Sequence, residues 1–336
     1  MIRIFAAAAL AGLAATPALA QEPPIAPKVL VITMFSAEAK PWHDDEALTR
    51  KIDIPGLFKT YPTVGCSEGG LCVMTTGMGY ANAASSVSAL AFSGRLDLTK
   101  TYVIISGIAG VDPAKGTLGG AYWARFAVDV GLQNEIDARE APENWSSGYL
   151  AIGSPAPGQK GKLGYESEVY RLDETLLQAA FRMTKGVELS DGEGAKAYRG
   201  RYGAPPASAP PTVAICDTMS SDTWWHGARL AAVMTERAGL ATDGAADPCT
   251  TQQEDNATLT ALSRAADAKR LDFSRVAVLR TASNFDREAP GQSAAESLAA
   301  RSGGFVPSVV NAYRVAGKLA HEIVSDWAKW RVGPPP

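Results

Sequence analysis

The sequence lacks the charge pattern of a protein that binds nucleic acid or anionic lipid. Its 336 residues include 32 Lys and Arg against 35 Asp and Glu, a formal net charge of -3 at pH 7. No basic field is available to hold a polyphosphate, so we expect no nucleic-acid partner. Histidine is also scarce, with only three residues, His43, His226 and His321. None lies at zinc-ligand spacing from a cysteine pair, and we predict no metal site.

Long apolar runs are absent after residue 20. A membrane-spanning helix needs about 18 consecutive apolar residues, and later runs such as 103–108 have only the length of a strand. The first residues differ: Arg3 precedes the apolar run 4–13, and Ala18-Leu19-Ala20 resembles a cleavage site. We therefore predict a signal peptide over residues 1–20. The mature chain should be soluble and periplasmic or secreted, and it should not span the membrane.

Cysteine is rare, but its number is even. Cys66, Cys72, Cys216 and Cys249 suit an oxidising compartment and allow three disulfide connectivities. The short Ser-Glu-Gly-Gly-Leu segment between the first two indicates a tight turn into a strand. We favour the pairs Cys66 with Cys72 and Cys216 with Cys249; the alternative is four buried thiols.

Strand-like and helix-like segments alternate along the rest of the chain. Unbroken apolar runs rich in β-branched residues, typical of strands covered on both faces, lie at 28–34, 71–76, 101–106, 212–216 and 276–279. Helical periodicity lies between and after them, at 81–92, 166–183, 224–238, 254–268 and 309–330. This order predicts an α/β fold: one three-layer domain over residues 21–336, with a central, mainly parallel sheet flanked by helices. The polar stretch 131–164 and the proline-rich stretch 200–211 are expected to be surface insertions or lids.

Candidate site residues follow the predicted strands, because ligands of open α/β sheets bind beyond the carboxyl ends of the strands. The chain has five such places: Glu38; the turn at Gly77; the small residues Gly107, Ala109 and Gly110; the segment with Asp222 and Trp224; and the cluster Arg280, Ser283, Asn284 and Asp286. Small residues allow a ligand to approach the main chain. A helix start after a glycine turn can offer N–H groups to an anion or a sugar hydroxyl.

Ordinary structural roles remain open for several of these residues. The turn at 77–79 can be no more than a tight turn, and Asp222 or Ser221 can be the N-cap of the next helix. Glu38 and Glu254 can be solvated acids on helix surfaces. A nicotinamide-linked oxidoreductase would rest on the Gly-x-Gly at 77–79 alone, because the third glycine and the acidic residue of a dinucleotide site are out of register.

The order of the motifs resembles one family. The segments 29–38, 76–84, 107–111, 220–224, 251–257 and 280–284 follow one another as in the purine nucleoside permease family and the nucleoside phosphorylase and nucleosidase superfamily. The resemblance covers nearly all of residues 28–330. It implies the phosphorylase/nucleosidase-like fold and a small-molecule purine nucleoside as ligand. It also implies a homo-oligomer, for which nothing else in the sequence argues.

The resemblance also implies roles for particular residues. Glu38 stands at the position of the carboxylate that activates water, with Arg280 and Ser283 helping to hold that water. Glu254 stands where the ribose hydroxyls are bound. Trp224 takes the place of the aromatic residue that stacks on the base, and Asn284 that of the residue hydrogen-bonded to the imidazole edge of the purine.

Three positions depart from the family pattern. Asn284 replaces an acid and cannot supply a proton, so the base leaves either stabilised by hydrogen bonding, as with 6-oxopurines, or protonated by Asp286. Ile108 stands where Ser is usual. Glu254 is followed by Asp255-Asn256 instead of small residues, which implies a shift of the helix that presents it.

The expected function is that of an exported purine nucleoside N-ribosyl hydrolase or phosphorylase. No cofactor is expected, apart from phosphate as co-substrate of a phosphorylase. Glu38 and the lack of a multi-arginine phosphate cradle favour hydrolysis. The alternative of another class is a non-catalytic periplasmic nucleoside-binding protein that assists transport.

Overall fold

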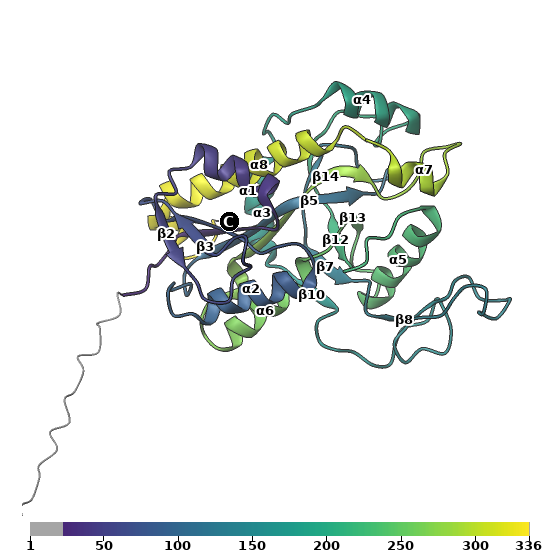
Figure 1. Ribbon diagram of the computed structural model, residues 1–336, viewed down its shortest axis with the longest axis horizontal. Helices are drawn as coiled ribbons and strands as arrows, with labels where there is room; N and C mark the ends of the chain where they lie inside the picture. The colour runs from purple at the N-terminus through teal and green to yellow at the C-terminus, as the bar shows by residue number, and fades with distance from the viewer. Residues whose placement is uncertain (1–22, 336) are drawn as a thin grey trace, which may run out of the picture.

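The alternating strands and helices build a sheet covered on both faces in residues 23–335, the part of the chain that this computed structural model describes (Figure 1). The predicted signal peptide, residues 1–20, lies outside the described residues. Within them, twelve strands form the large sheet: β1 (Val29–Thr33), β2 (Arg50–Asp53), β3 (Thr63–Cys66), β4 (Leu71–Thr75), β5 (Tyr102–Val111), β6 (Ala121–Trp123), β7 (Phe126–Asp129), β10 (Val169–Arg171), β11 (Val213–Ile215), β12 (Asp217–Ser220), β13 (Pro248–Gln252) and β14 (Val276–Phe285).

Helices pack on both faces of this sheet. They are α1 (Ser36–Asp45), α2 (Tyr80–Phe92), α3 (Glu174–Thr184), α4 (Glu193–Arg199), α5 (Ala228–Ala241), α6 (Asp255–Asp267), α7 (Ala294–Ala299), α8 (Phe305–Ser325) and α9 (Trp327–Trp330). Side chains of β1 alternate between two apolar cores, as the period of two along a strand requires. Leu30 and Ile32 pack with α2 and α6, whereas Val29 and Val31 pack with α1, α3 and α8. The predicted three-layer α/β fold is confirmed.

The sheet is mixed, with β5 at its centre. Strand β5 pairs in parallel with β1 and β14 and antiparallel with β13. The pairs β1–β4, β12–β13 and β12–β7 are also parallel. Antiparallel pairing is found in β2–β3–β4 and where β10 and β6 join the sheet. Because β1, β5 and β14 run in the same direction, their carboxyl ends meet at one edge of the sheet.

Strands β5 and β14 are longer than the apolar pattern predicted. The runs 101–106 and 276–279 continue as strand to Val111 and Phe285. The backbone N–H and C=O groups of the two strands form hydrogen bonds with each other. Small and polar residues near their ends are therefore kept in the paired β-structure. Residues that we placed in loops after these strands therefore lie within them.

Helix boundaries differ from prediction by more than one residue in three helices. Residues 169–171 form strand β10, so the helix predicted from 166 begins at Glu174, where Asp173 caps it. The helix predicted from 224 begins at Ala228, after Gly227. The last helix begins at Phe305, four residues before the predicted start at 309, and is interrupted at Asp326, between α8 and α9. Our N-cap reading of Asp222 or Ser221 for the helix after them was wrong, because the N-cap position of α5 is Gly227.

Both favoured disulfides are present. Cys66 and Cys72 face each other across the β3–β4 hairpin, in register as antiparallel partners. Cys216, between β11 and β12, is bonded to Cys249 in β13. The alternative of four buried thiols was wrong.

The two stretches that we predicted as insertions have different structures. Within 131–164, β8 (Gln133–Glu135) and β9 (Tyr149–Ala151) pair with each other in a separate two-stranded sheet, near the label β8 at the lower right of Figure 1. In 200–211, Ala207 is buried and its carbonyl accepts a bond from the Thr117 hydroxyl. This second stretch is anchored to the body of the protein. Within residues 23–335, we find no helix with the length and apolar character needed to cross a bilayer.

Candidate functional site

Glu38 lies in the first turn of α1, directly after the buried strand β1. Its side chain is buried, and both oxygens accept backbone hydrogen bonds. Oε2 accepts from Met34 N at 2.8 Å, and Oε1 accepts from Ile108 N at 2.7 Å. Glu38 is the third residue of the helix, the position of the acid in a capping box, but it accepts from Met34 N, one residue before the N-cap Phe35. Glu38 is therefore held in place against β5 and is not the solvated acid of the alternative reading.

Arg280 meets Glu38 where β5 and β14 pair. The parallel register places Arg280 opposite Gly107. A Cβ atom added at Gly107 would lie 2.6 Å from Glu38 Oε1 and 2.7 Å from Arg280 Nη1. The missing side chain thus leaves the space in which carboxylate and guanidinium approach each other. Gly107 is a packing requirement of this pair.

Asp255 is the main partner of Arg280. The arginine is 1% exposed, and its Nε donates to both Asp255 oxygens at 3.2 and 3.1 Å while Nη2 donates to Oδ1 at 2.7 Å. Nη1 donates to Ile108 O at 3.0 Å, and Nη2 lies 3.4 Å from Glu254 Oε2. The peptide groups of Ile108 thus contact both Glu38 and Arg280. Our sequence reasoning missed Asp255 as a member of this cluster, because an Asp in the first turn of a helix is ordinarily a solvated residue.

Glu254 is buried at the turn between β13 and α6. The side chain of Gln252 forms this turn, since its Oε1 accepts from Glu254 N at 2.7 Å and from Asp255 N at 2.8 Å. Those are donors that the start of a helix leaves free. Glu254 Oε1 accepts from Gly79 N at 3.1 Å. The glycine turn therefore presents an N–H group to an anion, as its sequence suggested, and that anion is Glu254.

The second polar group of the site lies four residues further along β14. Asn284 is paired with Gly110 after a bulge in the ladder. Its Nδ2 donates to Phe285 O, and its Oδ1 lies 2.8 Å from the Ser283 hydroxyl, which is also 3.1 Å from Ala109 O. A Cβ at Gly110 would lie 3.2 Å from Asn284 Nδ2. Small residues of β5 again leave room for polar residues of β14.

Asp286 faces another arginine. Arg287 binds it through Nε and Nη2 at 2.7 and 3.0 Å, and Arg287 also pairs with Asp112 at 2.9 Å. The Asp286 carboxylate, 2% exposed, is thus already engaged in an ion pair. Its backbone oxygen accepts from Gly227 N at 2.9 Å, which holds the loop that carries Trp224 beside this end of β14.

Trp224 and Asp222 lie on the loop between β12 and α5. Trp224 is 62% exposed. Asp222 caps a helix other than its own, because its Oδ1 accepts from Tyr80 N at 2.9 Å at the start of α2. Gly77, with φ of 86°, belongs to the turn before that helix. Its added Cβ would contact Phe58 and Asn82 at 3.1 Å, so this glycine packs against those side chains and not against Glu38 or Arg280.

Burial changes the ionisation of the site. Removal from water raises the pKa of Glu38 to about 7, although Arg280 and the two backbone N–H groups oppose the rise. Burial likewise raises the pKa of Glu254, again against Arg280. Burial alone would lower the pKa of Arg280, but Asp255 and Glu254 together raise it, so the guanidinium stays charged. Burial raises the pKa of Asp286 to about 6, partly offset by Arg287.

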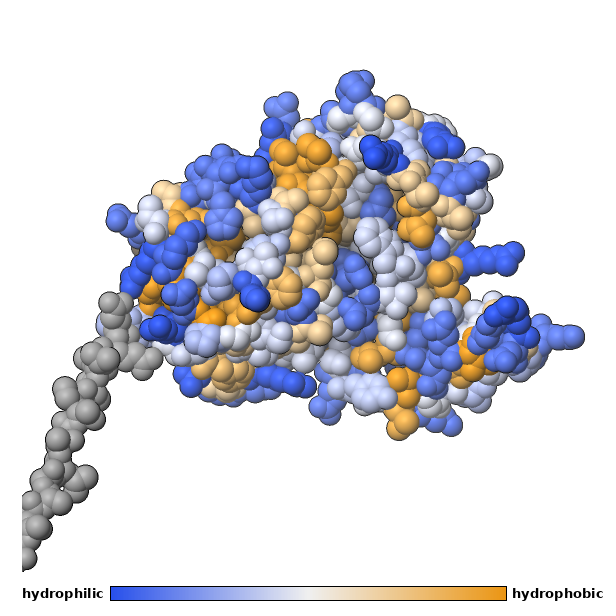
Figure 2. Space-filling view, in the orientation of Figure 1, coloured by the Kyte–Doolittle hydropathy of each residue, from blue (hydrophilic) through white to orange (hydrophobic). Residues whose placement is uncertain are grey.

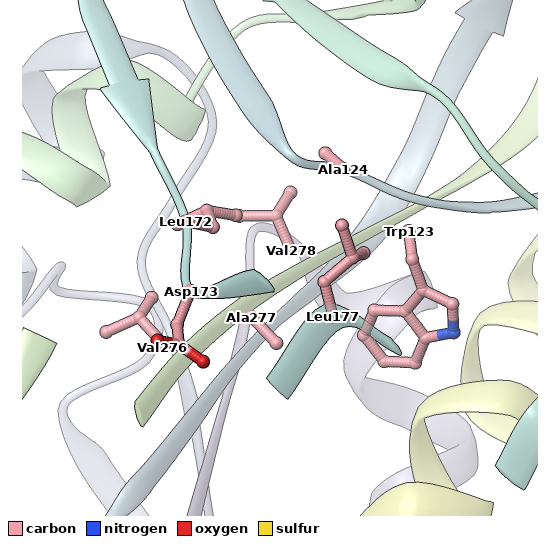
Figure 3. Close-up of a pocket in the computed structure, with 8 residues that line it drawn as sticks. All are labelled: Trp123, Ala124, Leu172, Asp173, Leu177, Val276, Ala277 and Val278. Carbon is pink, nitrogen blue, oxygen red and sulfur yellow. The ribbon is translucent and has the colours of Figure 1, made fainter. Parts of the chain in front are cut away.

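A narrow crevice elsewhere in the protein is apolar and contains none of these residues (Figure 3). Its walls include Trp123, Leu172 and Leu177. The charged residue among them, Asp173, accepts from Leu176 N as the cap of α3. This crevice is a packing feature between α3 and the sheet. The polar cluster around Glu38 and Arg280 is the candidate site.

Solved structures with the same architecture are nucleosidases. Over 88% of this chain and 98% of the other, the protein superposes with TM-score 0.53 and 14% identity on the 5'-methylthioadenosine/S-adenosylhomocysteine nucleosidase of Neisseria meningitidis, solved with methylthio-immucillin-A. The futalosine hydrolase of Helicobacter pylori gives TM-score 0.52 at 13% identity, with coverage of 88% and 98%. The fold is therefore of the phosphorylase/nucleosidase-like class.

The chain belongs to the purine nucleoside permease (NUP) family, whose sequence profile matches residues 26–335. A probable purine nucleoside permease of Schizosaccharomyces pombe is 39% identical over 318 residues, which are 90% of this chain and 91% of the relative. The purine nucleoside permease of Candida albicans is 37% identical over 309 residues, 90% of this chain and 76% of the relative. The resemblance seen in the motifs is confirmed.

Proposed function

We propose that this protein is an exported purine nucleoside N-ribosyl hydrolase, which releases the free base from the sugar. The observation that carries the proposal is the buried group of Glu38, Arg280 and Glu254 at the shared edge of β1, β5 and β14. A buried carboxyl group whose pKa is raised to about 7 can exchange a proton near neutral pH. Such groups are typical of general acid–base sites.

The reaction needs one group at the sugar and another at the base. Glu38 accepts a proton from water as the water oxygen bonds to C1' of the ribose. The C1'–N9 bond breaks, and its electron pair leaves with the base. Positive charge that develops on the ribose is stabilised by the neighbouring carboxylates. Glu254 binds the ribose hydroxyls. The purine anion takes up a proton from solvent and Glu38 returns its proton to solvent, so the products are ribose and a free purine.

The charge of the cluster favours water over phosphate as the attacking group. The Arg280 guanidinium already donates through Nε, Nη1 and Nη2 to Asp255, Glu254 and Ile108. An incoming phosphate dianion would meet these carboxylates and Glu38 without a free guanidinium to pair with. Water is uncharged, so the carboxylates do not repel it.

Hydrogen bonding stabilises the departing base. The amide of Asn284 retains one N–H beyond its bond to Phe285 O, and this donor can bind the imidazole edge of the purine. Ser283 supports the amide through its oxygen. Asp286 is the alternative proton donor, but its bond with Arg287 favours stabilisation by Asn284. Trp224, held near this end of β14, supplies an aromatic face for the base.

The family name supports a second candidate function. Relatives are called permeases, and a binding protein that delivers nucleoside to a membrane partner would fit that name. It would bind nucleoside through the same residues without turnover. The proposed export, and the predicted homo-oligomer, are shared by both candidates.

One assay separates the outcomes. Purified protein is incubated with inosine, guanosine or adenosine, with and without phosphate, and the products are separated by chromatography. Free base and ribose in the absence of phosphate are the expected result. Base with ribose 1-phosphate, formed only with phosphate, would show a phosphorylase instead. Tight binding by calorimetry with no product would show the binding protein.

A further inference from the structure

Asp255 is a buried carboxylate to which the proposed reaction gives no role. Its side chain is 0% exposed, and its two oxygens receive three contacts from Arg280, at 2.7 to 3.2 Å. A buried carboxylate is costly unless it is paired and hydrogen-bonded. Here the backbone is also held, because Asp255 N donates to Gln252. Asp255 is thus held rigidly at the start of α6, with its carboxylate bonded to one partner, Arg280.

That partner stands between Asp255 and Glu38. The Nε edge of the guanidinium faces Asp255, while Nη1 reaches Ile108 O. Arg280 Nη1 and Glu38 Oε1 both lie close to the empty Cβ position of Gly107, at 2.7 and 2.6 Å. Their separation is therefore no larger than the sum of those distances. Arg280 is shared between one carboxylate on α6 and another on α1.

We propose that Asp255 is a positioning residue: it orients the Arg280 guanidinium through a two-point bond and takes up its charge, so that Arg280 does not hold Glu38 as its main ion-pair partner. The proposal rests on the proposed function, in which Glu38 accepts the proton of water. Without Asp255, the whole positive charge of Arg280 would act on Glu38 and Glu254.

The surroundings of Glu38 are consistent with control by Arg280. The charged groups that act on it are Arg280 from β14 and Glu254 from the turn before α6. Strand β5 contributes the Ile108 N–H, and the residues of β4 that pack near α1 are uncharged. Two ionisable residues of α8, Tyr313 and His321, bind Glu46, the residue that follows the C-terminal end of α1, at the opposite end of that helix from Glu38.

The sign of the effect follows from these charges. Arg280 lowers the pKa of Glu38, whereas Glu254 raises it, and Asp255 raises the pKa of Glu254. Removing the charge of Asp255 while keeping its shape strengthens the pull of Arg280 on Glu38. The pKa of Glu38 should therefore fall. A purely structural role would give the opposite sign, because a released guanidinium would move away from Glu38.

The test uses Asp255→Asn and Asp255→Glu in the full chain. Asp255→Asn keeps an acceptor for Arg280 and removes the charge; we expect the acid limb of the kcat/KM profile to move down by about one pH unit. Asp255→Glu keeps the charge and displaces the guanidinium, so it should leave the limb near its wild-type position and lower kcat. An unchanged limb, or one at higher pH, in Asp255→Asn would overturn the proposal.

A second readout does not depend on catalysis. The protonation of Glu38 is followed by pH-difference infrared spectroscopy, with Glu38→Gln subtracted to identify its band. The same downward movement is expected in Asp255→Asn. If no nucleoside is cleaved by the wild type, the proposed function fails, but this titration still decides the role of Asp255. If Asp255→Asn does not fold, Asp255→Asn/Arg280→Gln removes both buried charges, and the Glu38 titration should then move above that of the wild type.

Discussion

At the scale of single residues, Glu38 is the group on which the proposed reaction depends. Glu38→Gln removes the proton acceptor while keeping the size of the side chain. We expect nucleoside cleavage to fall about 10²- to 10⁴-fold, the usual contribution of a placed general base. The matched control is Glu140→Gln, an exposed acid in the 131–164 stretch, which should retain full activity. Cleavage by Glu38→Gln at the wild-type rate would exclude the role assigned to this residue.

Gly107 offers a second test at the same scale. Gly107→Ala places a methyl group 2.0 Å from Met34 Cε and within 2.7 Å of Glu38 and Arg280 atoms. One or more of these side chains must move, so we expect a loss of at least 10-fold in kcat with a folded protein. Gly239→Ala is the control, because its Cβ meets no atom within 4 Å on helix α5. That control should be stabilised by up to about 1 kcal/mol; equal activity of both variants would contradict this geometry.

At the scale of elements, the two disulfides differ in the length of chain that they close. They join cysteines 6 and 33 residues apart, and all four positions are buried. Loop-closure entropy predicts stabilisation of about 2 kcal/mol for the short loop and about 4 kcal/mol for the long one. Cys216→Ala/Cys249→Ala should therefore lower the free energy of unfolding more than Cys66→Ala/Cys72→Ala. Urea unfolding of both oxidised proteins measures this, and the reverse order would contradict the argument.

Some strands could be predicted from the sequence, and others could not. Runs of apolar β-branched residues identified β1 and β4 to within one residue at each end. The ends of β5 and β14 were missed because their last residues include Gly107, Gly110 and Asn284. Pairing between the two strands outweighs the weak strand propensity of these residues. The short strands β7 and β12 carry no distinct pattern and were not predicted.

The surface at the start of α8 is another feature that the sequence alone did not predict. Phe305 and Val306 are exposed there, and Figure 2 shows apolar side chains gathered over this part of the molecule. Phe305 lies 6.2 Å from the ring of Phe35, the residue just before α1. The helix predicted from the sequence began only at residue 309, and the contact between Phe305 and Phe35 depends on how α1 and α8 pack.

At the scale of the whole molecule, buried acids determine how stability depends on pH. The pKa of Glu38 is raised to about 7 and that of Asp286 to about 6, and burial also raises the pKa of Glu254 and Asp129. The folded protein therefore holds protons that the unfolded chain releases from about pH 4 upward. This contribution to stability is complete below that pH and is lost as the pH rises through 7.

An opposite contribution acts in acid. Bonds from Arg125 lower the pKa of Glu174 to about 2, so the stability that this pair supplies is lost as the pH falls below about 4. We expect the free energy of unfolding to be greatest near pH 5 and to decrease towards pH 8. Urea unfolding at several pH values measures this curve. The decrease should be smaller in Glu38→Gln, and a curve that rises from pH 5 to 8 would contradict the assignment.

The sequence alone determined the character of single segments, because this depends on neighbours in the chain. The apolar strands and the tight Cys66–Cys72 turn are local patterns, and the α/β order and the family follow from the order of such patterns along the chain. The partners of buried charges are not determined locally. Asp255 is hydrogen-bonded to Arg280, 25 residues away, Glu254 accepts from Gly79 N, and Asp222 caps α2. The β5–β14 register and the packing of α6 bring these residues together. Only folding removes these groups from water, and the competition between burial and Arg280 then sets their ionisation.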